Sequence, residues 1–151
     1  MKKLFILASM LVLAGGVFAG PRTAKPVSII HARVMRDFVL RYDDVSYAQW
    51  MSDEKGSTMY FIKDGFRSRA VYDAKGRWLY SLVSYGEAGM PHDIRTVVKR
   101  ENFDLAITGV QEVQTEAGKA WIVHLEDNAN LKIVKVTMDR EMETMDEFRK
   151  L

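Results

Sequence analysis

The chain has 151 residues, no cysteine, and 22 lysine and arginine residues against 20 aspartate and glutamate residues. Without cysteine, disulfide bonds, thiolate metal sites and cysteine nucleophiles are excluded. Lys2 and Lys3 are the only charged residues before residue 20, so the rest of the chain is formally neutral. A neutral chain lacks the excess positive charge that favours nucleic acid or anionic membranes as partners.

The first 19 residues have the pattern of a secretory signal peptide. Lys2 and Lys3 precede the apolar run Leu4–Val17, which is shorter than the roughly 20 residues that a membrane span requires. Val17 and Ala19 occupy the −3 and −1 positions of a signal-peptidase site. We therefore expect cleavage after Ala19, a periplasmic or secreted protein, and no integral membrane span after cleavage. No cysteine is available for a lipid anchor.

A single domain is expected after a short lead-in. Residues 20–29 contain two of the three prolines and are expected to be flexible, and residues 30–151 are expected to form the domain. Between Ile30 and Tyr42 the apolar residues recur with the period of an α-helix, with charged residues on the other side. Asp43 and Asp44 are expected to end this helix.

Four strands are predicted next, over residues 45–51, 57–63, 66–72 and 77–85. The turns between them are predicted at residues 53–56, at Asp64-Gly65 and at residues 73–76. An Asp-Gly pair between two strand-like runs predicts a hairpin with a type I′ turn, because both turn positions need a positive φ. The Gly and Pro residues from Gly86 to Pro91 then interrupt the strand pattern.

A second helix is predicted from Pro91 to about Asn102, since proline is favoured in the first turn of a helix. Strands are predicted again over residues 106–114, 119–126 and 131–138. The tail, residues 141–151, is charged, with apolar residues at Met142, Met145 and Phe148. Its pattern is compatible with either a last strand or a short helix.

The order of a helix followed by strands occurs twice, in residues 30–85 and 91–151. Tyr42-Asp43 aligns with Phe103-Asp104, Gly56 with Gly118, and Asp64 with Asp127. Each half alone would be a poor fold, whereas two half-sheets joined end to end can bury their helices on one face. The sequence therefore predicts an α+β fold made of two tandem units, each a helix followed by strands, with the helices buried on one face.

The first unit carries the motifs of a known family. The spaced residues Val34, Phe38, Tyr42, Val45 and Trp50 are followed by Tyr60-x-Ile62-x2-Gly65 and by the run Ala70–Trp78. In this order they resemble the PepSY-like family of secreted Bacteroidetes proteins, also called β-lactamase-inhibitor-like. The resemblance is weaker over residues 91–140, where no tryptophan matches Trp50. The resemblance implies two helix-plus-four-strand units that form an antiparallel sheet, with the helices packed on one face and a concave face left open. Related β-lactamase-inhibitor proteins use such a face to bind an enzyme.

No motif of a catalytic or metal site is present. The three histidines, His31, His92 and His124, have no carboxylate or histidine partners at metal-ligand spacing. Neither a P-loop, a G-x-S-x-G motif nor a dinucleotide-binding glycine motif occurs. We therefore expect a protein that is not an enzyme and that binds neither a metal nor a cofactor.

Aromatic residues are concentrated between Tyr60 and Tyr85. Alternation along Arg77–Tyr85 places Trp78, Tyr80 and Leu82 on one face and Leu79, Val83 and Tyr85 on the other. A sheet with one face in solvent would alternate apolar with polar residues. The second face is therefore either covered or forms an aromatic surface for a partner.

Six residues are the candidate partner-binding residues: Tyr60, Tyr72, Trp78, Tyr80, Arg67 and Arg69. Tyrosine, tryptophan and arginine dominate binding energy at interfaces. The alternative for the aromatic residues is core packing, and for the arginines a solvated strand face. The leading hypothesis is an exported module that recognises a protein or peptide, as an inhibitor or regulator of an envelope enzyme. The alternatives are a protein that self-associates through an open strand edge, and a small-ligand binder.

Overall fold

The computed structural model describes residues 31–150. The predicted signal peptide, its cleavage site and the lead-in over residues 20–29 lie outside the described residues. Two helices and eight strands follow the predicted order, with a short 3-10 helix, η1 (Glu87–Gly89), before the second helix. The first unit contains α1 (Ala32–Arg41), β1 (Ser46–Asp53), β2 (Gly56–Lys63), β3 (Phe66–Asp73) and β4 (Trp78–Tyr85). The second contains α2 (His92–Glu101), β5 (Ala106–Thr115), β6 (Gly118–Glu126), β7 (Asn130–Thr137) and β8 (Met142–Arg149).

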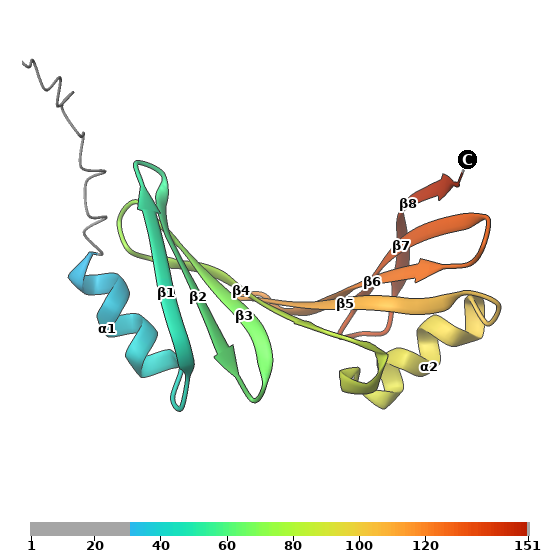
Figure 1. Ribbon diagram of the computed structural model, residues 1–151, viewed down its shortest axis with the longest axis horizontal. Helices are drawn as coiled ribbons and strands as arrows, with labels where there is room; N and C mark the ends of the chain where they lie inside the picture. The colour runs from blue at the N-terminus through green and yellow to red at the C-terminus, as the bar shows by residue number, and fades with distance from the viewer. Residues whose placement is uncertain (1–30, 151) are drawn as a thin grey trace, which may run out of the picture.

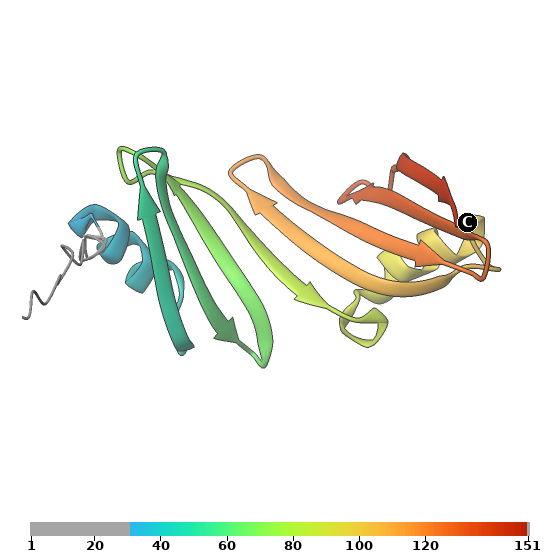
Figure 2. The same cartoon turned by 45° about the horizontal axis from the view of Figure 1, so that its top comes forward.

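All eight strands form one antiparallel sheet in chain order, from β1 at one edge to β8 at the other. The predicted antiparallel sheet with two tandem units is therefore confirmed, and the tail is a strand, not a helix. Both helices lie on the same side of this sheet, and the sheet bends away from them (Figure 1). When the molecule is tilted, the other side comes into view, with α2 behind the strands of the second unit (Figure 2).

The turns follow from local chemistry. Asp64 and Gly65 have φ values of 53° and 80°, which confirms the predicted pair of positive φ angles. At the turn after β3, the Asp73 carboxylate accepts hydrogen bonds from the backbone N–H groups of Lys75 and Arg77, both at 2.9 Å. Aspartate is favoured at such positions because its side chain satisfies backbone donors that the strands leave free.

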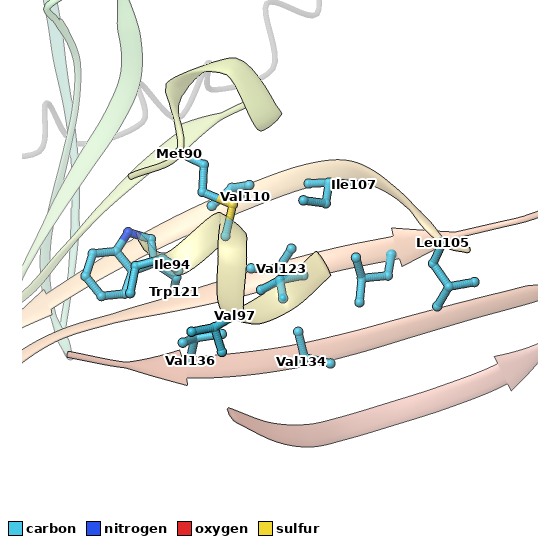
Figure 3. Packing of buried hydrophobic residues seen from close by; sticks show 12 residues of the cluster. Met90, Ile94, Val97, Leu105, Ile107, Val110, Trp121, Val123, Val134 and Val136 are labelled. Carbon is cyan, nitrogen blue, oxygen red and sulfur yellow. The ribbon is translucent and has the colours of Figure 1, made fainter. Parts of the chain in front are cut away.

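Each unit has its own hydrophobic core between its helix and its half of the sheet. In the first unit, Val34 and Phe38 of α1 pack on Met59, Phe61 and other residues of β2–β4. In the second, α2 packs on β5–β7 through a larger cluster (Figure 3). Full burial of one such aliphatic or aromatic side chain contributes about 1.5–3 kcal/mol. Each helix is therefore held mainly by the apolar stripe that it buries.

The two units match, with one correction to the alignment. Both helices have ten residues, and their C-caps are Tyr42 and Asn102, so Tyr42 corresponds to Asn102 and not to Phe103. Asn102 is buried and donates a hydrogen bond to the carbonyl of Val98, whereas Phe103 is 80 % exposed. Further along, Gly56 and Gly118 both begin the second strand of their unit with positive φ, as the alignment expects. Pro91 is the N-cap of α2 and does not lie within its first turn.

Candidate functional site on the open face of the sheet

The sheet has two different faces, which we call the helix face and the open face. The helix face is covered by α1 and α2, and the open face is the opposite one. Strand alternation assigns each residue to one of them. Met59 on β2 and Ala70 on β3 belong to the core on the helix face. Tyr60 is adjacent to Met59 and Arg69 is adjacent to Ala70, so both Tyr60 and Arg69 lie on the open face. No other described residues form a layer over the open face.

Strand register arranges the open face in rows that cross the sheet. One row, the central row, joins directly paired residues of seven strands: Gln49, Tyr60, Arg69, Leu82, Val113, Ala120 and Thr137. The neighbouring row, the second row, contains Ile62, Arg67, Ser84, Gln111, Ile122, Lys135 and Glu143. Four of the six candidate residues lie on the open face: Tyr60, Arg67, Arg69 and Tyr80. The first three belong to these two rows, and Tyr80 is on the same face because it pairs with Val71, two residues from Arg69 on β3. The structure therefore brings two tyrosines and two arginines together across β2–β4.

The remaining two candidates, Tyr72 and Trp78, lie on the helix face. Tyr72 is 1 % exposed and Trp78 is 8 % exposed, and both belong to the core beneath α1. The prediction that Trp78 and Tyr80 share a face is wrong. Trp78 pairs with Tyr72 and Tyr80 pairs with Val71, so Leu79 is an extra residue in a β-bulge, which turns Trp78 and Tyr80 to opposite faces.

Trp78 is held in the core by polar contacts as well as by packing. Its indole Nε1–H donates to the Ser81 hydroxyl at 3.0 Å. On its other side, the Arg41 guanidinium lies 4.2 Å from the ring centroid, a cation–π contact. Arg41 also pairs with Asp37, at 3.1 Å from Nε to Oδ2. These contacts use the indole N–H and one ring face within the protein, so Trp78 is not available to a partner.

Tyr72 lies in the same core, but its hydroxyl is buried without a hydrogen-bond partner in the described part of the chain. Burial, followed by the nearby Asp37 carboxylate, raises the pKa of its hydroxyl far above the usual value of a tyrosine. Burial is the largest influence on Asp37 and by itself would raise its pKa, but the Arg41 hydrogen bond, the nearby Tyr72 hydroxyl and the charges of Arg41 and Arg33 together outweigh it, so the pKa of Asp37 is lowered overall. Tyr72 therefore belongs to a structural group with Asp37 and Arg41 beneath α1.

Exposed apolar residues surround the four candidates that do lie on the open face. Leu79 is 46 % exposed, Met51 is 67 % exposed and Tyr60 is 42 % exposed. Together with Val71 they line an open depression of about 450 Å³ over the first unit. Sequence reasoning missed both Met51 and Leu79. Leu79 was missed because strand alternation without the bulge assigns it to the other face.

A second depression lies over the second unit. It has a volume of about 570 Å³ and is lined by Val113, Ala120, Ile122, Lys135 and neighbouring residues. The two depressions adjoin Gly56 and Gly118, which are equivalent residues of the two units. The open face is thus hollowed once in each unit. The central row contributes to both hollows, with Tyr60 in the first and Val113, Ala120 and Thr137 in the second.

The helix face also has a groove, where the two units meet. Its volume is about 410 Å³, and Tyr42, Phe61, Phe66, Val83 and Tyr85 are among its lining residues. Its polar groups bond one another. Trp121 donates to the Tyr85 hydroxyl at 3.0 Å, Tyr85 donates to Glu112 at 3.0 Å, and Lys119 donates to Glu112 at 2.6 Å. Burial, with the Glu112 carboxylate, raises the pKa of Tyr85 and keeps its hydroxyl a donor.

Among residues 31–150, no group of three or more His, Asp or Glu side chains is arranged to hold a metal ion. The three histidines are far apart in the fold: His31 caps α1 by accepting from the Arg33 backbone N–H, His92 begins α2, and His124 lies on β6. Within the same described residues, no helix has both the length and the apolar character needed to cross a membrane.

Comparison with known proteins shows similarity of fold. No family model matches the chain, and no curated protein matches its sequence. A BLIP-like protein from Bacteroides fragilis has a similar structure, with a TM-score of 0.67 and 12 % identity over 80 % of this chain and 86 % of that one. A DUF2874 family protein from Bacteroides uniformis gives a TM-score of 0.64 and 15 % identity, over 80 % of this chain and 90 % of that one. A protein from Bacteroides eggerthii, described as a proposed periplasmic protein, gives a TM-score of 0.64 and 13 % identity, over 80 % and 89 % of the two chains.

Proposed function

We propose that the protein is an exported, non-enzymatic binding module of the PepSY-like, β-lactamase-inhibitor-like type. It recognises a protein or peptide through the open face and acts as an inhibitor or regulator of an envelope enzyme. One observation carries this proposal. Both helices cover the same face of an eight-stranded sheet, while the opposite face carries exposed Met51, Tyr60 and Leu79 without a covering layer among residues 31–150.

The composition of the open face supports a macromolecular partner. Contiguous exposed apolar surface is costly in water and marks interaction sites in soluble proteins. Tyrosine and arginine supply most of the binding energy at interfaces, and here Tyr60, Tyr80, Arg67 and Arg69 lie on adjacent strands. Two shallow depressions suit the protruding side chains or loops of another protein better than an enclosed small ligand.

A location beyond the inner membrane fits this proposal. The signal-peptide pattern of residues 1–19 supports export, and one protein of similar fold is described as a proposed periplasmic protein. An enzyme of the cell envelope is accessible to an exported module, so the partner is sought there.

The proposal is tested by capture followed by measurement of affinity. The protein is immobilised and exposed to envelope extract from its source, and bound proteins are identified by mass spectrometry. Each candidate is then purified and its Kd is measured by calorimetry with the parent and with Tyr60→Ser/Tyr80→Ser. We expect the Kd to rise at least about 30-fold, the equivalent of one interface hot spot of about 2 kcal/mol.

The matched control is Val39→Ser/Leu40→Ser, which removes two apolar side chains that are 63 % and 81 % exposed on α1, away from the open face. We expect it to bind as the parent does. Equal losses in both double variants, or no loss in either, would show that the partner does not use the open face.

A further inference from the structure

Arg67 and Arg69 are cations without an acidic partner in the described part of the chain. Eight ion pairs occur among residues 31–150, and neither arginine belongs to any of them. Nor does either side chain donate one of the hydrogen bonds found there, and the Nε atom of Arg69 is buried without an acceptor. On the neighbouring strand β2, Lys63 is paired with Asp43 at 2.7 Å, whereas Lys132, Lys135 and Arg149 of β7 and β8 belong to none of these ion pairs. Arg69 differs from the other strand cations in the Nε atom that it buries without an acceptor in this part of the chain.

Their neighbours on the open face are apolar or neutral. In the central row, Arg69 lies between Tyr60 on β2 and Leu82 on β4. In the second row, Arg67 lies between Ile62 and Ser84. From β2 to β6 neither row contains an aspartate or glutamate, and the first carboxylate of the second row is Glu143 on β8. The middle of the open face is thus positive and has no compensating negative charge.

A partner that covers Tyr60 necessarily covers Arg69, because the two residues are directly paired. Removing a guanidinium from water without offering it an acceptor is strongly unfavourable. A purely apolar partner would therefore lose on Arg69 what it gains on Tyr60. A partner that brings a carboxylate to the same place replaces the lost hydration with charge-assisted hydrogen bonds.

We infer that the partner presents an acidic segment of polypeptide, in which an aspartate or glutamate flanked by apolar residues is seated on Arg67 and Arg69. This inference rests on the proposed binding function of the open face and names the chemistry of its partner. The planar guanidinium binds a carboxylate through two parallel hydrogen bonds, and two guanidinium groups on one strand suit one or two carboxylates. The flanking apolar residues of the segment cover Tyr60, Leu79 and Tyr80.

The test uses a displayed library of random peptides as the probe. The protein is used to select peptides at low ionic strength, and the recovered sequences are compared with the unselected library. We expect enrichment of Asp and Glu next to apolar or aromatic residues, and no enrichment of Lys or Arg. For a recovered acidic peptide, Arg69→Gln or Arg67→Gln is expected to raise the Kd about 10-fold to 100-fold, the usual contribution of a hydrogen bond to a charged group.

Three controls separate the causes of a loss. Arg36→Gln removes the same charge from α1 on the helix face and is expected to leave the Kd within about twofold, since a distant exposed charge acts only through screened, long-range forces. Arg69→Lys keeps the charge without the planar fork and is expected to lose less than Arg69→Gln. A recovered peptide in which the Asp or Glu is replaced by Asn or Gln is expected to bind the parent protein about 10-fold to 100-fold more weakly.

The outcomes distinguish this inference from the proposed function. Recovered peptides that need Tyr60 and Tyr80 but lack acidic residues, or that bind Arg67→Gln and Arg69→Gln unchanged, overturn the acidic partner and leave the open face as a binding site. Unchanged binding of the peptide with Asn or Gln in place of Asp or Glu overturns the assignment to carboxylates. Recovery of no peptide, or of peptides indifferent to all four residues, overturns both.

Discussion

Tyr60 on β2 lies directly opposite Arg69 on β3, and both side chains are on the face of the sheet that neither helix covers. The Arg69 guanidinium has no acidic partner among residues 31–150, and its Nε atom is buried without an acceptor. The guanidinium therefore gains no ion pair within the described part of the free protein. Local violations of polar pairing of this kind are typical of functional sites.

Replacing Arg69 with methionine is expected to preserve or raise stability. Methionine has a similar length and fits between Tyr60 and Leu82, and the change removes a buried polar atom that lacks a partner. We expect the free energy of unfolding to stay the same or rise by about 1 kcal/mol. Urea unfolding measures it. A fall of more than about 1 kcal/mol would show that Arg69 is needed by the fold itself.

Trp78 and Tyr80 are expected to respond differently to truncation, although only one residue separates them. Trp78 is 8 % exposed and bonded to Ser81, so Trp78→Ala is expected to cost about 3–5 kcal/mol. Tyr80 lies on the open face, and Tyr80→Ala is expected to cost about 1 kcal/mol or less. Urea unfolding of both variants tests this. Equal costs would contradict the bulge at Leu79, which places them on opposite faces.

Gly56 and Gly118 are equivalent residues with unequal surroundings. Alanine at Gly56 would place its Cβ 2.0 Å from the Tyr72 carbonyl oxygen, whereas at Gly118 the nearest atom is the flexible Met138 sulfur at 3.4 Å. Both have positive φ, so each substitution carries backbone strain of about 1–3 kcal/mol. We expect Gly118→Ala to lower the free energy of unfolding, measured with urea, by about 1–3 kcal/mol, and Gly56→Ala to lower it further. A smaller effect at Gly56 would contradict the close approach of β2 to Tyr72.

Acid is expected to destabilise the fold through its turn aspartates. Hydrogen bonds from backbone N–H groups, of Arg77 to Asp73 and of Ala129 to Asp127, lower the pKa of each carboxyl below its ordinary value of 3.8. A carboxyl with a lowered pKa in the folded state contributes stability above its unfolded pKa, and this contribution is lost as pH falls. We expect stability to decline below about pH 4, less steeply in Asp73→Asn/Asp127→Asn.

Calorimetry across a pH series measures this decline. The control is Asp104→Asn, which removes an exposed carboxylate that forms no side-chain hydrogen bond or ion pair among residues 31–150. It is expected to keep the pH dependence of the parent. A double variant as acid-sensitive as the parent would rule out these two carboxyls as the cause.

The two edges of the sheet are irregular, which disfavours self-association. In β1 the pairing shifts between Ser46 and Gln49, where Tyr47 has a φ of 53°, and in β8 it shifts at Met145. Bulges and charged residues on edge strands hinder the addition of another strand. We expect a monomer in sedimentation across a roughly hundredfold range of concentration. Reversible dimers would instead favour the self-association hypothesis.

The elements themselves could be predicted from local sequence, because their causes are local. The apolar period from Ile30 to Tyr42, the Asp64-Gly65 pair and the β-branched and aromatic runs each act over a few residues. The repeated order of helix and strands then indicated two units on one sheet, and the structure confirms it. For the tail, residues 141–151, local signals conflicted, and pairing of β8 with β7 decides for a strand.

The sequence by itself determined the two-unit antiparallel fold, the turns, and the concentration of aromatic residues on β2–β4. Only the tertiary structure decided which aromatic residues face the core. A single extra residue, Leu79, moves Trp78 to the face opposite Tyr80, because side chains along a strand alternate with a period of two. The bulge is visible only in the pairing of β4 with β3, a contact between chain segments. For the same reason, the row that joins Tyr60, Arg69 and Leu82 exists only in the folded sheet.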